Sequence, residues 1–379
     1  MIFVTLFVFI CYTIMILHFN SGFNRLKSPG KGPSEPENHF SILVPFRNEE
    51  NNLPTLLKSI NKLDYPKDMF QLILVDDSSS DKSKEIAIQF RDDHQELNIL
   101  VIENDSTGNS PKKSALNKGI SLALKPWILT TDADCIVPPS WLKTFDNLID
   151  TKDLKMIVAP VGYTEGDGFL YNFQVLDFLS LQGITIGSFG MQDKPFIKPF
   201  LCNGANLCYK KESFYEVEGF KGNEHLASGD DVFLLEKMIS EFPNQVEFVK
   251  SREAIVRTLP KKTWIELIRQ RIRWAAKTTA FSASFSKLIG LLVFLTNLLV
   301  LVIIILGILG QMPWGQVGLL FLLKFNLDFI FLHKTARFFE QEGAMKSYIF
   351  SSLVYPAFTV LIVVLSLKKS YTWKDRKLS

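Results

Sequence analysis

Two pairs of aspartates each end a run of apolar residues that is typical of a buried strand. Asp76 and Asp77 end one such run, and Asp132 and Asp134 end another. Burying an unpaired charge costs several kcal/mol, so a core strand gains nothing from these acids, and either a loop begins there or a ligand binds there. Two carboxylates one residue apart can hold a divalent cation, Mg²⁺ or Mn²⁺, which then neutralises a diphosphate. Because Asp-x-Asp is common in loops, a solvated loop is an equal alternative for Asp132 and Asp134.

A third pair of acids, Asp230 and Asp231, lies in "ASGDDVFLLEKM", where a helix is expected to begin. Ser228 or Asp230 could cap that helix, and acids at its start suit the helix dipole. The functional alternative makes one carboxylate a general base that takes a proton from an attacking hydroxyl.

A basic amphipathic helix is predicted for residues 264–281, just before a long apolar segment. Such a helix could simply lie on a membrane surface. Its cluster of Gln270, Arg271, Arg273 and Trp274 is denser than surface anchoring requires. Arginine is suited to diphosphate oxygens, so we favour a ligand-binding function for the cluster.

The elements that would position these residues alternate between strand and helix. Strands are predicted at 39–46, 70–77, 97–104 and 126–134, and helical stretches at 47–60, 78–90 and 110–124. This alternation predicts an α/β fold with a mostly parallel sheet and helices on both faces. Ligands of such sheets bind beyond the carboxyl ends of the strands, where the aspartates lie.

Apolar segments flank this domain on both sides. We expect an N-terminal transmembrane helix at 1–19, a linker at 20–37, an α/β domain at 38–260, an amphipathic interfacial region at 261–285 and a C-terminal transmembrane region at 286–379 with a basic tail. The first segment lacks the early basic residues and the cleavage site of a signal peptide, so we interpret it as an uncleaved anchor.

The C-terminal region contains two or three spans, at 288–310, 315–333 and 347–367. The middle one contains Lys324 and Asp328, which are four residues apart and could pair on one face of a helix.

Basic residues after the anchor, Arg25, Lys27 and Lys31, predict a multi-pass protein of the cell (inner) membrane with its catalytic domain in the cytoplasm. Three C-terminal spans would nevertheless put the basic tail outside, so one segment could be re-entrant, and 315–333 is the first suspect. The formal charge of +3 is too small to indicate a nucleic-acid partner, and the four cysteines lack metal-binding spacing.

Eight motifs in a fixed order resemble those of membrane-integrated family 2 glycosyltransferases. They are "VPFRNEENNLPTLLKSI" (44–60), "YP" (65–66), "LVDDSSSD" (74–81), "KKSALNKGI" (112–120), "TDAD" (131–134), "CNGAN" (202–206), "SGDD" (228–231) and "QRIRW" (270–274). The resemblance implies a GT-A fold, with a Rossmann-like mixed sheet between N- and C-terminal transmembrane helices. It also implies a nucleotide-diphosphate sugar donor, a divalent metal, and inverting transfer to a membrane-associated acceptor in the lipid bilayer.

The resemblance further implies a role for each matching residue. Asp77 would bind the nucleotide base, with Pro45, Arg47 and Glu49 in the same pocket. Lys113 would approach the nucleotide-sugar, Asp132 would meet its sugar and ribose side as well as the metal, and Asp134 would hold the metal. Asp231 would be the catalytic base, with Asp230 as a competitor. Gln270, Arg271, Arg273 and Trp274 would cradle the diphosphate and the acceptor sugar, and Asn203 and Gly204 would line the acceptor cleft.

Three alternatives remain open. A processive polysaccharide synthase would also carry the Gln-x-x-Arg-Trp motif, although the few spans count against it. A nucleotidyltransferase would be expected to show a glycine-rich phosphate loop near the first strand, and "VPFRNEENN" has none. A non-catalytic membrane scaffold would not be expected to keep Asp134, Asp231 and Arg273 together.

Overall fold

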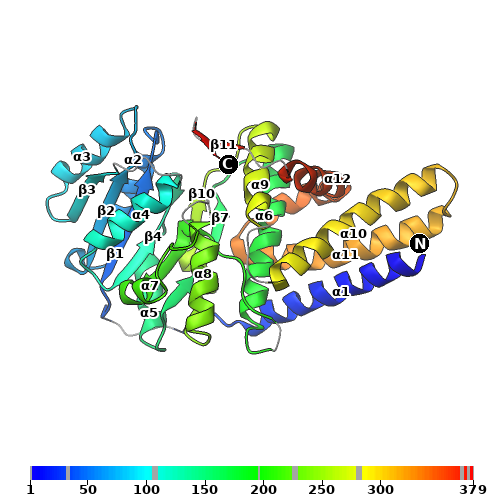
Figure 1. Ribbon diagram of the computed structural model, residues 1–379, viewed down its shortest axis with the longest axis horizontal. Helices are drawn as coiled ribbons and strands as arrows, with labels where there is room; N and C mark the ends of the chain where they lie inside the picture. The colour runs from blue at the N-terminus through cyan, green and yellow to red at the C-terminus, as the bar shows by residue number, and fades with distance from the viewer. Residues whose placement is uncertain are drawn as a thin grey trace. The chain divides into compact units, whose positions relative to one another are not determined.

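The computed structural model describes residues 2–30, 35–104, 110–194, 197–223, 229–278, 284–367, 371–373 and 376–378. The chain forms two compact units (Figure 1), which are treated separately below. The α/β unit contains residues 27–164 and 201–259, and the helical unit contains residues 1–26, 165–200 and 260–379.

The α/β unit is built on a seven-stranded mixed sheet in the order β3-β2-β1-β4-β8-β6-β9. Its strands are β1 (Phe40–Phe46), β2 (Phe70–Asp76), β3 (Asn98–Glu103), β4 (Trp127–Thr130), β6 (Met156–Val158), β8 (Leu207–Lys210) and β9 (Val246–Phe248). The first four strands are parallel, whereas β8 is antiparallel to both β4 and β6. The predicted mixed α/β sheet is therefore confirmed.

Helices connect the strands on both sides of this sheet: α2 (Leu53–Asn61), α3 (Ser83–Asp93), α4 (Pro111–Leu122), α5 (Trp141–Ile149), α7 (Lys211–Glu216) and α8 (Asp230–Glu241). The helix predicted from residue 47 begins six residues later, at Leu53. Pro54 occupies its first turn, where a missing backbone N–H costs nothing. Because β2 and β4 are parallel, their carboxyl ends lie at the same edge of the sheet, next to the N-terminus of α4.

The α/β unit also contains a second, smaller sheet and a 3₁₀ turn, η2, that is held by a buried asparagine. The strands β5 (Cys135–Ile136), β10 (Val256–Thr258) and β7 (Val161–Tyr163) form the sheet, and short 3₁₀ turns lie at η1 (Lys67–Met69), η2 (Gly204–Asn206) and η3 (Arg252–Ala254). Asn206 is fully buried; its amide donates to the carbonyls of Pro160 and Ala254, and its oxygen accepts from Trp141. Because buried amide groups need such partners, this network holds η2 in one position.

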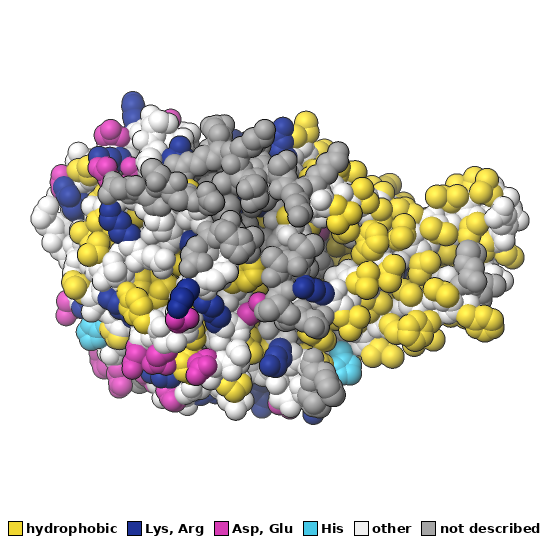
Figure 2. All heavy atoms as spheres, viewed as in Figure 1, with side chains coloured by type: hydrophobic (Ala, Val, Ile, Leu, Met, Phe, Trp, Pro, Cys, Tyr) yellow, Lys and Arg dark blue, Asp and Glu magenta, His cyan; other side chains and the backbone are white. Residues whose placement is uncertain are grey.

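The helical unit contains α1 (Ile2–Arg25), α6 (Gly168–Phe189), α9 (Trp264–Thr278), α10 (Ser284–Ile308), η4 (Glu342–Ser347), α11 (Trp314–Phe339) and α12 (Tyr348–Ser366), together with a small ribbon of β11 (Tyr371–Trp373) and β12 (Arg376–Leu378). Among the described residues, four helical segments are long and apolar enough to cross a membrane, namely 3–25, 285–308, 314–339 and 342–366. Hydrophobic side chains cover the surface where α1, α10 and α11 lie (Figure 2), as lipid contact requires.

The helix α6 differs from expectation, because its residues fall within the predicted α/β domain but pack in the helical unit. Gly187 and Gly190 face α1 so closely that an added Cβ would lie 2.5 Å from the Phe19 carbonyl oxygen and 1.9 Å from that of Gly22. Small residues of this kind let two helix backbones approach each other. The predicted α/β domain, residues 38–260, includes α6 because the sequence alone does not reveal its packing against α1.

The charged pair predicted inside the apolar C-terminal region is present. Lys324 and Asp328 form an ion pair of 2.5 Å, and both belong to an unbroken α11. The helix is therefore continuous through 315–333, and whether this segment is re-entrant stays open. It is α12 that runs in a different direction: Figure 1 shows it nearly end-on, whereas α1, α10 and α11 lie lengthwise in the same view.

Candidate active site

The two acids that end β2 are both buried and have separate structural partners. The carboxylate of Asp76 accepts a hydrogen bond from the backbone N–H of Ser79 at 3.0 Å, which closes the turn after the strand. Asp77 accepts from the side-chain amide of Asn104 at 2.8 Å. Each aspartate is only 3% exposed. Asp76 thus shapes the loop, and the predicted binding of a nucleotide base by Asp77 stays a prediction.

The residues predicted to share this pocket hold its loops together. Arg47 donates to the backbone carbonyls of Asp77 at 2.7 Å and of Ser78 at 2.9 Å. Glu49 accepts a hydrogen bond from Asn52, and its backbone N–H donates to Ser83. Pro45 lies in β1, beside Val75 of β2. These contacts fix the chain around Asp77.

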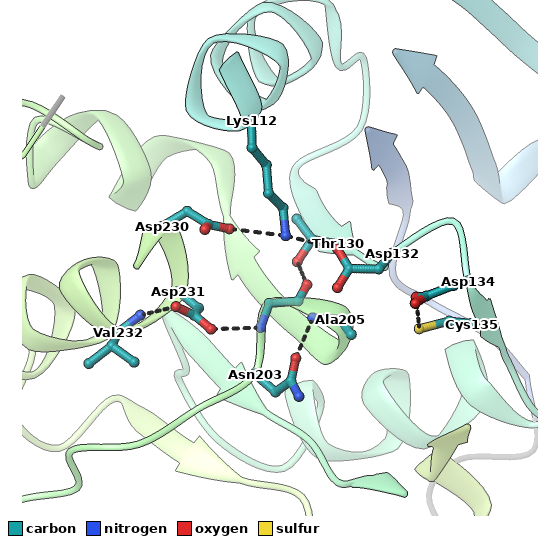
Figure 3. Close-up of polar contacts among 11 residues, drawn as sticks. Lys112, Thr130, Asp132, Asp134, Cys135, Asn203, Ala205, Asp230, Asp231 and Val232 are labelled. Carbon is teal, nitrogen blue, oxygen red and sulfur yellow. Dashed lines mark hydrogen bonds and ion pairs between the residues drawn. The ribbon is translucent and has the colours of Figure 1, made fainter. Parts of the chain in front are cut away.

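A lysine that was not predicted joins two of the predicted acids (Figure 3). The ammonium group of Lys112 lies 2.8 Å from Asp132 Oδ1 and 3.5 Å from Asp230 Oδ2. Burial opposes the charge on this lysine, but the neighbouring Asp132 and Asp230 outweigh that effect and raise the pKa of Lys112 above its ordinary value. Lys112 therefore carries a fixed positive charge at the edge of the sheet.

Lys113, the lysine named from the sequence, lies elsewhere. It is 2% exposed, its ammonium group donates to the backbone carbonyl of Asn223 at 2.6 Å, and it lies 5.5 Å from the centre of the Phe233 ring. Successive residues on a helix point about 100° apart, so only one of two adjacent lysines can face the acids. Nothing in the sequence separated the two. The geometry favours Lys112 as the residue that meets a donor.

Asp132 and Asp134 provide oxygen ligands but not a complete metal site. Asp134 is half-buried and approaches the thiol of Cys135 at 3.8 Å. Burial, then the charges of Asp134 and Asp132, raises the pKa of that thiol, so it is a poor thiolate ligand. No group of three or more His, Cys, Asp or Glu side chains that could hold a metal occurs among the described residues. A cation bound by one or two carboxylates takes its remaining ligands from water and from substrate phosphates, which is usual for Mg²⁺.

The acids of the third pair face different partners. Gly229 precedes α8 with φ of +88°, a backbone conformation that glycine adopts without strain, and this turn places Asp230 and Asp231 at the start of the helix. Asp230 is 8% exposed and faces Lys112, whereas Asp231 accepts from the backbone N–H of Gly204 at 3.2 Å and of Val232 at 2.9 Å. Ser228, the other predicted cap, lies outside the described residues.

The turn η2 packs against both acids. Asn203 accepts from the backbone N–H of Ala205 at 3.0 Å, and Thr130 at the end of β4 donates to the Gly204 carbonyl at 2.8 Å. A Cβ on Gly204 would lie 3.3 Å from Asp230 Oδ2, which is tighter than ordinary contact. Gly204 is thus brought next to Asp230 and Asp231, and the acceptor cleft of Asn203 and Gly204 stays a prediction.

The arginine cluster belongs to the helical unit and is only partly available to a ligand. Arg271 is 5% exposed; its Nε lies 2.5 Å from Asp177 of α6, Nη1 donates to Gln270 at 2.6 Å, and the guanidinium lies 4.2 Å from the centre of the Trp274 ring. These contacts favour a structural role for Arg271 over the predicted binding of diphosphate. Arg273 is more exposed and stays the predicted ligand-binding arginine. That the arginines and Asp134 share one donor stays a prediction.

Comparison with known proteins identifies most of the α/β unit together with α6. Residues 41–217 match the model of the family "Glycosyl transferase family 2". These residues are a family 2 glycosyltransferase domain. The match covers just under half of the chain and includes the acids at the ends of β2 and β4, Lys112, Asn203 and Gly204, whereas Asp230, Asp231 and residues 270–274 lie beyond it.

Two relatives and one solved structure illustrate the range of similar proteins. Glycosyltransferase AglE of Haloferax volcanii is 27% identical over 192 residues, which are 51% of this chain and 58% of AglE. Beta-monoglucosyldiacylglycerol synthase of Trichormus variabilis is 32% identical over 102 residues, which are 27% of this chain and 21% of the synthase. The chain thus spans little more than half the length of the first relative. The mannosyltransferase PcManGT of Pyrobaculum calidifontis, solved with GDP-Man and Mn²⁺, has a TM-score of 0.58 at 14% identity and covers 93% of this chain and 98% of its own.

These findings confirm a family 2 glycosyltransferase domain at residues 41–217 and the GT-A type of fold. Because the sequence identity to PcManGT is only 14%, this similarity shows a shared fold and nothing more. Because the family model ends at residue 217, the assignment of Asp231 as the base and of Arg273 as a ligand-binding residue depends on the sequence motifs and on the geometry described above.

Proposed function

We propose that this chain is an inverting glycosyltransferase, which moves a sugar from a nucleotide-diphosphate sugar to a hydroxyl of a membrane-associated acceptor. The observation that carries the proposal is the cluster of Lys112, Asp132 and Asp230 beside Asp231, at the ligand-binding edge of a family 2 domain. The apolar helices support an acceptor held in the bilayer, which is a glycolipid, a lipid-linked saccharide or a polysaccharide.

The donor diphosphate is expected to bind next to Lys112. An ammonium group with a raised pKa stays charged at neutral pH, and phosphate oxygens accept strong charge-assisted hydrogen bonds from it. In the structure this charge is compensated by Asp132 and Asp230. A bound diphosphate would take over part of that compensation, and Asp132 would become available to a metal ion.

A divalent metal, Mg²⁺ or Mn²⁺, fits the carboxylates of Asp132 and Asp134. Their oxygens suit a hard cation, and the lack of a larger cluster of ligands among the described residues fits an ion that is shared with substrate phosphates. When bound, the ion would neutralise charge on the departing nucleoside diphosphate.

Asp231 is the proposed general base. Two backbone N–H groups hold its carboxylate, one from Gly204 in η2 and one from its own helix. A base fixed in this way can take the proton from an acceptor hydroxyl as that oxygen attacks the sugar on the face opposite the leaving group. Attack from that face inverts the configuration at the anomeric carbon.

The membrane orientation is part of the same proposal. The chain would be a multi-pass protein of the cell (inner) membrane with the α/β unit in the cytoplasm, because basic residues such as Arg25 and Lys27 follow the first apolar helix. Nucleotide-sugar donors would then reach the site from the cytoplasm.

The deciding experiment measures release of nucleoside diphosphate from a panel of nucleotide sugars by the purified full chain in detergent, with and without added membrane lipid extract. We expect one donor to be turned over, faster with lipid extract, and a D132N/D134N variant to give the background rate. Release from no donor, or equal release by that variant, would contradict the proposal. The length of the product, read on a gel, separates single transfer from the processive alternative.

A further inference from the structure

A cavity with several polar groups in a mainly apolar lining lies inside the helical unit. It has a volume of about 80 Å³ and is bounded by α1, α6, α10, α11 and α12. Its polar lining includes Tyr12, Asp177, Lys324, Asp328, Ser351 and Tyr355. Since a single buried water needs about 10–15 Å³ measured in this way, the cavity has room for several waters or for a small polar group.

One wall of the cavity contains the ion pair of α11. Lys324 lies 2.5 Å from Asp328, and the two side chains are 8% and 18% exposed. The hydroxyl of Tyr12 on α1 donates to the other oxygen of Asp328 at 2.6 Å. Charges at this depth in a membrane helix are costly, and they usually mark a binding site or a pathway. If helix association were the only purpose, an apolar pair would serve it at least as well.

The facing wall contains a hydroxyl that lacks a partner. Ser351 of α12 is 5% exposed and lines the cavity, and its Oγ has no hydrogen-bond partner among the residues that the structure describes. An unsatisfied buried hydroxyl costs about 1–3 kcal/mol. Because the Oγ itself is covered in the structure, a ligand in the cavity would remove this cost once the Ser351 side chain rotates toward it.

The charges that surround the cavity decide what kind of ligand fits. Lys324 is paired with Asp328, and Asp177 is paired with Arg271, so the described lining residues carry no surplus positive charge for a phosphate group. The remaining groups are carboxylate oxygens that accept, an ammonium group that donates, and hydroxyls that do both. Hydroxyl groups of an uncharged ligand match this set.

We propose that this cavity binds the hydroxyl-bearing headgroup of an uncharged membrane lipid. The exposed face of α12 beside it is apolar, with Phe350, Leu353 and Val354 at 66%, 55% and 39% exposure, and provides a surface for the lipid's hydrocarbon chains. The proposal concerns binding alone and does not depend on the proposed transfer reaction. If the bound lipid were also the acceptor, it would limit that acceptor to a neutral lipid alcohol or glycolipid.

The test is native mass spectrometry of the purified full chain in detergent, with four added probes: diacylglycerol, monoglucosyl-diacylglycerol, phosphatidic acid and free glycerol. We expect the chain to retain one or both uncharged lipids and to bind phosphatidic acid at least tenfold more weakly. Free glycerol, which has the hydroxyls without the chains, should not compete at equal concentration. Equal retention of phosphatidic acid, or retention of no lipid, which would leave a cavity filled by water alone, overturns the proposal.

Three variants locate the binding. Ser351→Leu fills the cavity and should lower lipid retention at least tenfold, while Ser351→Ala removes only the hydroxyl and should lower it several-fold. Ser366→Leu, on the same helix but outside the lining, is the matched control and should retain lipid as the parent does. The milder Ser351→Ala keeps the test decisive if the leucine variant does not fold. Parental retention by a folded Ser351→Ala and Ser351→Leu would show that lipid binds elsewhere and would overturn the assignment.

Discussion

Lys112 lies between Asp132 and Asp230, and its ammonium group is closer to the former, at 2.8 Å against 3.5 Å. The three side chains come from α4, from the end of β4 and from the start of α8, so the contact joins three separate segments of the chain. If the domain binds a nucleotide sugar as proposed, a lysine held in this way is the group that we expect to meet the diphosphate.

We therefore predict that Lys112→Met weakens donor binding. Charge-assisted hydrogen bonds contribute about 1.5–3 kcal/mol, which corresponds to a rise of roughly 10- to 150-fold in the KM for the donor. The KM for the donor is measured by steady-state kinetics of nucleoside diphosphate release. Lys62→Met, at an exposed lysine after α2, should leave KM unchanged. An unchanged KM in Lys112→Met would remove this lysine from the donor site.

We predict that Asp231→Asn lowers turnover by about 10²–10⁴ while donor binding stays near the parental value, because only proton removal from the acceptor is lost. Isothermal titration with the donor and initial-rate kinetics separate the two effects.

Asp230→Asn is the comparison that identifies the base. Asp230 contacts Lys112, whereas Asp231 accepts from the backbone of η2, so replacement of Asp230 should alter the KM for the donor more than turnover. If Asp230→Asn instead abolished turnover and Asp231→Asn retained it, the two acids would have to exchange roles.

The sequence predicted the sheet well because its signal is local. Strands such as Phe40–Phe46 and Phe70–Asp76 are continuous apolar runs, and acids that follow such runs in a parallel sheet must meet at one edge. The choice between Lys112 and Lys113 depends on the rotation of α4 about its own axis. That rotation is set by packing against the sheet, which adjacent residues of the same type do not reveal.

The helical unit was harder to predict because its decisive contacts join distant segments. The α6 helix is mostly apolar and largely buried, and its close approach to α1 through Gly187 and Gly190 helps to explain why it packs in the helical unit. The partner of Arg271 is 94 residues away in α6. A sequence motif indicates that an arginine is important. It does not show whether the arginine binds a ligand or stabilises the fold, because that depends on a partner that the motif does not reveal.

We predict that Arg271→Met destabilises the protein. Arg271 and Asp177 are 5% and 9% exposed, and breaking such a buried pair leaves an uncompensated charge at a cost of about 3–5 kcal/mol. Thermal unfolding in detergent should show a lower Tm, and the double variant Arg271→Met with Asp177→Leu should recover most of the loss.

Arg273→Met separates structure from ligand binding on the same helix. It should keep the parental Tm and lose activity, since Arg273 is the arginine that we expect to meet the donor. The assignment of Arg271 to a structural role fails if Arg271→Met keeps its Tm and loses only donor affinity.

We predict that a chelator abolishes donor turnover and that Mg²⁺ or Mn²⁺ restores it. Asp134→Asn would remove one of the two proposed carboxylate ligands, so the metal concentration for half-maximal activity should rise at least tenfold. Glu96→Gln, at an exposed acid paired with Lys67, should show the parental metal dependence. Full activity in the chelator would show that the reaction needs no divalent ion.

The direction of α12 leads to a prediction about the C-terminus. The helix α12 is long and apolar enough to span a membrane. In Figure 1, however, α12 is seen nearly end-on while α1, α10 and α11 lie lengthwise, so α12 does not run parallel to them. Its Phe358 and Ile362 pack against Leu267 of α9, the basic amphipathic helix expected at the membrane surface. We therefore expect α12 to lie along the membrane and the basic tail to remain on the same side as the α/β unit, as the distribution of positive charge favours.

A cysteine at the C-terminal Ser379, in a background without the four native cysteines, tests this topology. A membrane-impermeant maleimide should not label it in intact cells and should label it after lysis, and a reporter cysteine at exposed Lys62 in the α/β unit should behave in the same way. Labelling of the tail in intact cells, with Lys62→Cys protected, would instead show that α12 crosses the bilayer as a fourth span.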